Sequence, residues 1–132
     1  MSKKTILDVG NCGPDHSALG SMLRKHFDVE LLKADQLSDT LALLERQSVD
    51  LILINRKLDI DYSDGIDILH ALKKSEAYRD IPVMLITNYA EHQQQAVEAG
   101  AILGFGKLEL NAPETLKRLE AVLKPSRANA GA

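Results

Sequence analysis

The sequence predicts a doubly wound α/β fold, in which helices cover both faces of a parallel sheet. Five short apolar runs alternate with longer amphipathic segments, as repeated strand–helix units require. Two of these runs, 51–54 and 83–86, are apolar at every position, which is typical of strands buried on both faces. With 132 residues, the chain is long enough for one such domain and too short for two.

The predicted elements follow one another along the chain. The strands are expected at residues 5–9, 29–32, 51–54, 83–86 and 102–105. The helices are indicated by apolar residues at helical spacing, at Leu19, Met22, Leu23 and Phe27, at Leu37, Leu41 and Leu44, at Leu69 and Leu72, and at Leu116, Leu119 and Leu123. The third helix is expected to begin near Asp64, and the fourth to end at Gly100 in a left-handed conformation.

Composition predicts a cytoplasmic globular protein. Hydrophobic residues make up 45% of the chain and charged residues 27%, and no apolar run approaches the roughly 20 residues of a membrane span. We expect residues 1–123 to form one domain and residues 124–132 to form a flexible tail too short for a further domain. The single cysteine, Cys12, excludes an internal disulfide, and the net charge of −3 argues against nucleic acid or a membrane surface as a partner.

Function in a doubly wound sheet is expected beyond the carboxyl ends of the strands. The segments that follow the predicted strands there are 10–14, 55–65, 87–89 and 106–108. Candidate functional residues are therefore expected in these four segments.

Four short motifs occur in order along the chain. They are Lys3-Lys4-x-Ile6-Leu7 at the start, Pro82-Val83-x-x-x-Thr87 at the fourth strand, Glu98-Ala99-Gly100-Ala101 before the fifth, and Lys107 just after it. With these motifs, residues 3 to about 123 resemble the receiver domain of two-component response regulators. The resemblance implies a flavodoxin-like (βα)5 fold with five parallel strands in the order 2-1-3-4-5.

The resemblance also implies a particular chemistry. In such receivers an aspartate that ends the third strand takes up a phosphoryl group, and two acidic residues that end the first strand help to hold Mg²⁺. A Ser or Thr that ends the fourth strand and a Lys after the fifth contact the phosphoryl oxygens. The last two positions are Thr87 and Lys107 in this chain.

The acidic part of this site is missing. The acidic pair falls on Gly10 and Asn11, and the phospho-acceptor position is Asn55. An amide nitrogen is a poor nucleophile, and the attraction for a divalent cation is lost with the carboxylates. We therefore expect a degenerate receiver, or pseudo-receiver, with no catalytic residue, no cofactor and weak or absent Mg²⁺ binding.

Further departures lie around the expected pocket. Leu58-Asp59 stands where Met-Pro is usual, and the following Asp64-Gly65 comes about two residues late, so the loop after the third strand is lengthened. The aromatic residue that often couples the Thr to the output surface falls on Gly104. Phe105 is expected to be core packing, because adjacent strand residues point to opposite faces.

The predicted function is that of a stand-alone signalling module, not an enzyme, that binds another signalling protein or forms a homodimer without phosphorylation. By resemblance, the binding surface is expected to run from the fourth helix through the fifth strand to the fifth helix. Lys107 should sit over the empty pocket, where it bonds the Asn55 oxygen or a nearby carbonyl, finds a carboxylate, or turns toward solvent.

Three alternatives remain open at this stage. A displaced acceptor can come from Asp8 or from the loop aspartates Asp59, Asp61 and Asp64; Asp8 otherwise needs a backbone or lysine partner inside its strand. A flavodoxin-like cofactor module has its phosphate loop at 10–13, with Tyr89 for stacking. A thiol enzyme uses Cys12, but the sequence lacks the arginine six residues later that a tyrosine phosphatase needs. The four histidines, among them His16, are expected on helix surfaces.

Overall fold

The five apolar runs form the five strands of one parallel sheet. The computed structural model describes residues 3–123, and the predicted tail, 124–132, lies outside these residues. The strands are β1 (Lys4–Val9), β2 (Val29–Ala34), β3 (Leu51–Asn55), β4 (Val83–Ile86) and β5 (Ile102–Phe105). All pairings are parallel, and the order is β2-β1-β3-β4-β5, which confirms the predicted fold class.

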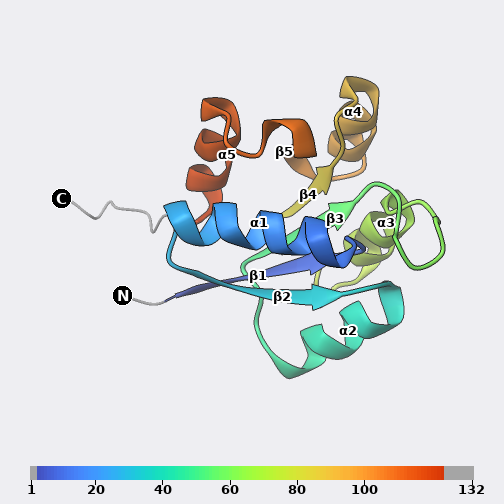
Figure 1. The fold of residues 1–132 in the computed structure, drawn as a ribbon. Coiled ribbons are helices and arrows are strands. Elements are labelled where there is room, and N and C mark those ends of the chain that lie inside the picture. The colour runs from blue at the N-terminus through green and yellow to red at the C-terminus, as the bar shows by residue number, and fades with distance from the viewer. Residues whose placement is uncertain (1–2, 124–132) are drawn as a thin grey trace.

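Helices cover both faces of the sheet (Figure 1). One face packs against α1 (Gly13–His26) and α5 (Pro113–Leu123), and the other against α2 (Leu37–Arg46), α3 (Ile66–Lys74) and α4 (Ala90–Glu98). Within β3, Leu51 and Leu53 point to the first face, and Ile52 and Ile54 point to the second. All four side chains are fully buried, which explains why this run is apolar at every position.

Two helix boundaries differ from the predicted ones. The α3 helix begins at Ile66, two residues later than expected, although Asp64 still accepts a hydrogen bond from the Ile66 N–H at 3.1 Å. The α4 helix ends at Glu98, and Gly100 follows with φ +111°, in the left-handed conformation that was predicted for it.

The pairing of β4 with β5 is irregular. Met84 pairs with Ile102 and Ile86 pairs with Phe105, so two steps along β4 correspond to three along β5. The extra residue makes this a bulged edge of the sheet.

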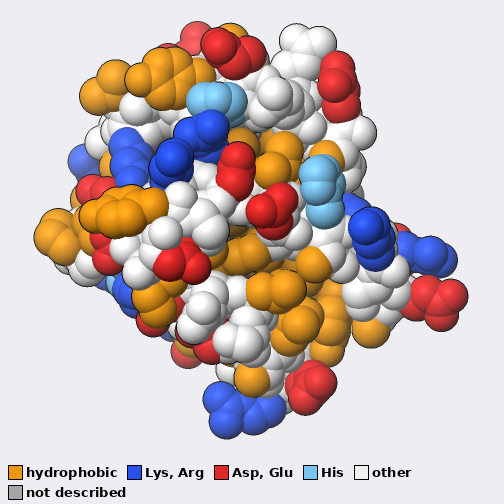
Figure 2. Space-filling view, turned by 90° about the vertical axis from the view of Figure 1, so that its right-hand side faces the viewer, with side chains coloured by type: hydrophobic (Ala, Val, Ile, Leu, Met, Phe, Trp, Pro, Cys, Tyr) orange, Lys and Arg blue, Asp and Glu red, His pale blue; other side chains and the backbone are white. Residues whose placement is uncertain are grey.

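The carboxyl ends of the strands meet at one edge of the molecule, on the right of Figure 1. A short 3₁₀ helix, η1 (Lys107–Glu109), follows β5 at this edge. Figure 2 views the molecule from this side, and acidic, basic and hydrophobic side chains are interspersed over it. The predicted functional segments lie at this edge.

Candidate functional site

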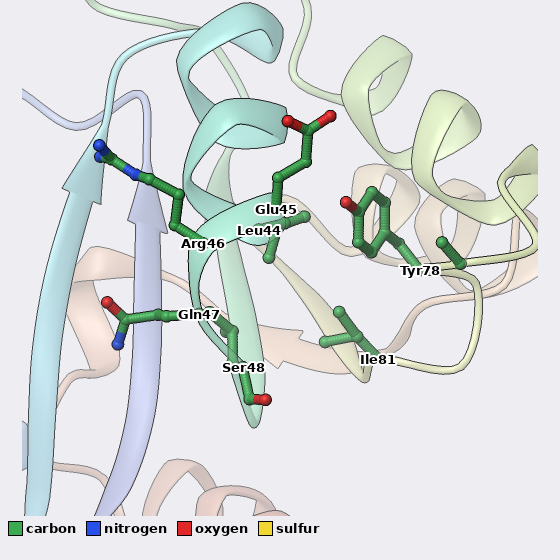
Figure 3. Close-up of a pocket in the computed structure, with 9 residues that line it drawn as sticks. Leu44, Glu45, Arg46, Gln47, Ser48, Tyr78 and Ile81 are labelled. Carbon is green, nitrogen blue, oxygen red and sulfur yellow. The ribbon is translucent and has the colours of Figure 1, made fainter.

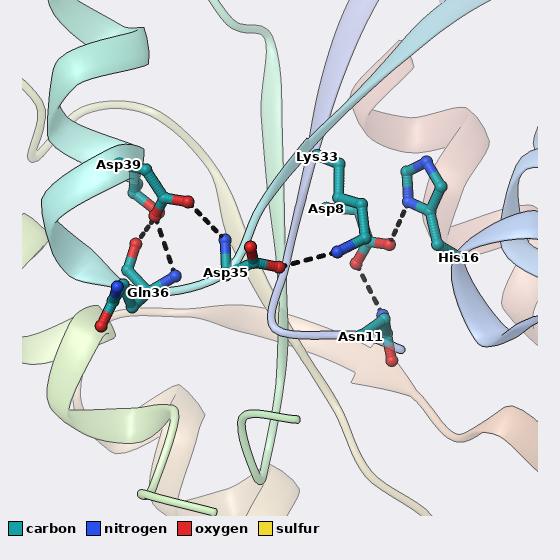
Figure 4. A network of polar contacts seen from close by, with 8 residues as sticks. Asp8, Asn11, His16, Lys33, Asp35, Gln36 and Asp39 are labelled. Carbon is teal, nitrogen blue, oxygen red and sulfur yellow. Dashed lines mark hydrogen bonds and ion pairs between the residues drawn. The ribbon is translucent and has the colours of Figure 1, made fainter. Parts of the chain in front are cut away.

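The end of β1 carries a fully buried carboxylate, Asp8 (Figure 4). Asn11 Nδ2 donates to Asp8 Oδ1 over 2.6 Å, and His16 Nδ1 lies 2.7 Å from Asp8 Oδ2. Burial raises the pKa of Asp8, while the hydrogen bonds from His16 and Asn11 and the charge of Lys33 act in the opposite direction. The expected backbone or lysine partner is therefore wrong, because an amide and an imidazole provide the contacts.

His16 was missed as a site residue. It lies in the first turn of α1, and its ring contacts Asp8 near the end of β1. One oxygen of the Asp8 carboxylate is bonded to His16 and the other to Asn11. The sequence contained one usable signal: a carboxylate inside a buried strand requires polar partners nearby.

Gly10 is covered by a side chain from the loop after β3. Gly10 has φ +86°, and a Cβ atom there would overlap the side chain of Leu58, which is only 3% exposed. The Asp59 N–H donates to the Gly10 carbonyl over 2.8 Å. The first acidic position of the resemblance is thus a glycine packed beneath a leucine.

Asn55, the predicted phospho-acceptor position, is engaged within its own loop. Its Nδ2 donates to the Lys57 carbonyl over 2.6 Å. Beyond it, residues 57–64 form a hairpin-like loop: Lys57 pairs with Asp64 as an antiparallel bridge, and the Leu58 N–H donates to the Ser63 carbonyl over 2.9 Å. These contacts hold the lengthened loop over the ends of β1 and β3.

Thr87 and Lys107 both have partners within the chain. Thr87 is 8% exposed, and its Oγ1 accepts from the Tyr89 N–H over 3.3 Å. Lys107 Nζ donates to Asp15 Oδ2 over 2.7 Å. The expected contact of Lys107 with Asn55 is wrong, and the carboxylate that it finds comes from the first turn of α1.

Asp15 was not anticipated, although it follows β1 at the same sheet edge that Lys107 occupies after β5. The hydrogen bond from Lys107 lowers the pKa of Asp15 despite its partial burial, and the Cys12 thiol adds a further hydrogen bond. Cys12 is partly exposed and lies at the N-cap of α1.

Gly104 has no room for a side chain. A Cβ atom there would overlap the Leu85 carbonyl oxygen of the neighbouring strand. The next residue, Phe105, is 1% exposed and packs in the core on the α1 and α5 side, as predicted. A ring at position 104 would therefore require β4 and β5 to separate.

The side chains of Asp61 and Asp64 make their contacts within the loop after β3. Asp61 Oδ1 accepts from the Ser63 N–H and hydroxyl, and Asp64 accepts from Ile66 and lies 4.0 Å from Arg56. Asp59 is exposed. Within residues 3–123, no hydrogen bond or ion pair joins the side chain of any of these three aspartates to Thr87 or Lys107.

A hollow in the surface lies at the opposite end of the sheet, where the strands begin (Figure 3). It measures about 460 Å³ and lies between the end of α2 and the segment before β4, where Leu44, Arg46, Tyr78 and Ile81 line it. It holds none of the predicted site residues.

Comparison with known proteins identifies the family. The family model of the response regulator receiver domain matches residues 15–118, more than half of the chain. The chain belongs to this family. Receiver domains act in two-component signalling, as signalling modules rather than classical enzymes, and they interact with other signalling proteins.

Solved receiver structures share the fold. The signal receiver domain of a DNA-binding response regulator (merR) from Colwellia psychrerythraea 34H has 22% identity and a TM-score of 0.78, over 93% of this chain and 100% of that one. The HemR receiver domain from Leptospira biflexa has 24% identity and a TM-score of 0.72, over 95% and 98%. NtrX from Brucella abortus has 22% identity and a TM-score of 0.75, and the match spans 92% of this chain but only 27% of that protein. A search of curated proteins finds no match.

Mg²⁺, which the resemblance implies for a phosphorylatable receiver, does not fit the residues of this receiver. Mg²⁺ requires hard and usually anionic oxygen ligands. Gly10 offers no side chain, Asn11 offers a neutral amide oxygen, and both oxygens of Asp8 are already engaged. Within residues 3–123, no three His, Cys, Asp or Glu side chains are grouped to hold a metal.

No helix among the described residues is long and apolar enough to cross a membrane.

Proposed function

We propose that this receiver signals by binding another protein, or a second copy of itself, without being phosphorylated. The contact between Gly10 and Leu58 carries the proposal. It puts a hydrocarbon side chain over the residue that would supply the first acidic ligand, and the positive φ of Gly10 disfavours any replacement of the glycine by an aspartate. The site therefore differs from that of a phosphorylatable receiver by more than a single substitution.

The two polar positions that remain support the same proposal. In a phosphorylatable receiver, the Thr and the Lys would contact a phosphoryl group. Here the Thr87 hydroxyl accepts a backbone hydrogen bond, and the Lys107 ammonium is neutralised by Asp15. Neither group needs a bound anion to satisfy it, and Asn55 provides no nucleophile for an acyl phosphate.

The favoured recognition surface is the α4–β5–α5 face, which we define as α4, β5, α5 and the segments that join them. Seven large hydrophobic side chains are exposed among the described residues, and five of them lie on or beside this face. These five are Tyr89, Val97, Ile102, Leu103 and Leu108. Exposed apolar side chains gathered in one region are typical of protein-binding surfaces.

Beryllofluoride with Mg²⁺ mimics a phosphoryl group. Adding it tests whether phosphorylation would change the conformation of the α4–β5–α5 face. We expect the amide spectrum of residues 87–110 to stay unchanged, because the mimic needs the acidic ligands that are missing. Widespread shifts over those residues would instead favour a phosphorylatable receiver that uses a displaced aspartate.

A second experiment tests the surface itself. A partner that binds the α4–β5–α5 face should be retained by the wild type and by the Thr87→Ala variant, and lost with Leu103→Glu. Ile60→Glu is the matched control, because Ile60 is equally apolar and 51% exposed but lies in the loop after β3. Loss of the partner with Ile60→Glu rather than Leu103→Glu would move the recognition surface to that loop.

A further inference from the structure

Three consecutive glutamines on α4 have different environments. Gln94 and Gln95 are exposed, whereas Gln93 is 9% exposed and its amide reaches the bulged pairing of β4 with β5. Gln93 Nε2 donates to the Leu85 carbonyl over 2.9 Å, and Gln93 Oε1 accepts from the Gly104 N–H over 2.9 Å. One side-chain amide thus joins α4 to both strands.

The other polar atom of Gly104 is bonded from the opposite side. Arg118 Nη1, on α5, donates to the Gly104 carbonyl over 2.7 Å. The two polar atoms of this one residue are therefore bonded to side chains from α4 and α5. Because Gly104 lies where the two strands pair irregularly, these side chains supply contacts that a regular ladder would take from the backbone.

Close approach of the strands makes this arrangement specific to glycine. A Cβ at position 104 would overlap the Leu85 carbonyl oxygen, so any larger residue would push β5 away from β4 and from the Gln93 amide. The residue that replaces the usual aromatic is thus also the residue on which both helices converge.

We propose that Gln93 and Arg118 are positioning residues that hold α4 and α5 on Gly104, so that the α4–β5–α5 face is preassembled in one arrangement. We name these three residues the Gly104 clamp. The inference rests on the proposed function only in taking this face as the recognition surface. The clamp fixes the face from inside, without a modification elsewhere in the domain.

The wild-type protein provides the first test. A scalar coupling across the hydrogen bond between the Gly104 amide nitrogen and the Gln93 side-chain carbonyl carbon should be measurable by NMR. The side-chain NH₂ protons of Gln93 should exchange with solvent more slowly than those of Gln94 and Gln95. Absence of the coupling, with equal exchange of the three glutamines, would overturn the proposal.

Substitution provides the second test. Gln93→Met keeps the length of the side chain and removes its hydrogen bonds, and Gln94→Met is the matched control on the same helix. We expect the Gly104 amide to exchange about tenfold faster in Gln93→Met and at the wild-type rate in Gln94→Met. An equal rate at Gly104 in the two variants would contradict the clamp.

The location of the induced motion separates positioning from general stability. In Gln93→Met and in Arg118→Met, relaxation dispersion should appear over residues 87–119 and should be absent from β1 and β3. Lys117→Met, at the exposed neighbouring position, is the control for Arg118→Met and should show no added dispersion. Motion spread evenly over the whole sheet would mean that these residues contribute only to stability. These NMR measurements use no phosphoryl donor, so their outcome does not depend on whether the protein can be phosphorylated. Phosphorylation of an aspartate in a separate experiment would refute the proposed function and leave the result for the clamp unchanged.

Discussion

Lys107 and Asp15 form an ion pair that ties the segment after β5 to the first turn of α1. The Lys107 ammonium lies 2.7 Å from Asp15 Oδ2, and the two side chains are 35% and 42% exposed. The sequence resemblance predicts that this lysine stands at the position whose lysine contacts the phosphoryl group in phosphorylatable receivers. Its partner here is internal, so its retention in the sequence does not require a phosphoryl group.

The ion pair should contribute little to stability. Because both side chains are more than a third exposed, we expect a coupling free energy of about 0.5 kcal/mol from a double-mutant cycle of Asp15→Asn and Lys107→Met. Urea unfolding at low and high salt measures the coupling, which should shrink as salt rises. Zero coupling at low salt would mean that Lys107 does not hold Asp15 in solution.

Gly10 should not tolerate a side chain. Gly10→Ala requires a residue with a Cβ at φ +86° and displaces Leu58, so we expect a loss of about 2 kcal/mol or more in the free energy of unfolding. Gly13→Ala is the matched control, because a Cβ at position 13 meets no atom within 4 Å. Equal stability of the two variants would show that Leu58 does not cover Gly10.

Restoring the acidic residues is predicted to fail for the same reason. The sequence alone suggests that Gly10→Asp and Asn11→Asp should help Asn55→Asp to accept a phosphoryl group if the loop leaves the pocket open. The loop covers Gly10, and an aspartate at position 11 would put a second carboxylate beside buried Asp8. We expect the triple variant to unfold at lower urea than the wild type and to remain poorly phosphorylated in intact-mass measurements; efficient labelling would contradict this.

Leu58 should behave as a core residue although it lies in a loop. Leu58→Ala removes a side chain that is 97% buried in the core between the sheet and α3, and we expect it to cost about 2–4 kcal/mol. Leu108→Ala is the control, because Leu108 is 85% exposed, and its effect should lie within about 0.5 kcal/mol of zero. A neutral Leu58→Ala would mean that the loop is not packed down in solution.

The pH dependence of stability should carry the signature of Asp8. Burial raises the pKa of Asp8 in the folded protein above its unfolded value, so its favourable contribution is present at low pH and is lost as pH rises through the folded pKa. Asp8→Asn removes this loss and keeps an acceptor for Asn11. We expect the stability of Asp8→Asn relative to wild type to increase from pH 4 toward neutral pH in urea titrations; a relative decrease would show that His16 and Asn11 outweigh burial.

The sequence predicts the strands of the sheet correctly, but it does not predict the side-chain contacts at the edge of the sheet. Periodicity identifies β3 because residues 51–54 are buried on both faces, and Gly100 marks the end of α4 by its left-handed conformation. The partners of Asp8 and Lys107 depend on how α1 lies across the sheet edge, which helical spacing does not define.

The role of Gln93 was equally hidden in the sequence. Three adjacent glutamines are chemically identical, and only the rotation of α4 against the β4–β5 bulge selects the first of them for burial. Long-range contacts of this kind require the relative placement of elements, whereas strand and helix patterns need only local spacing.

Intact-mass analysis after incubation with acetyl phosphate and Mg²⁺ tests the central claim most directly. We predict that the mass stays that of the unmodified chain, because Asn55 cannot form an acyl phosphate and the carboxylates for Mg²⁺ are missing. A hydroxylamine-labile gain of one phosphoryl group, mapped to Asp8, Asp59, Asp61 or Asp64, would contradict the account.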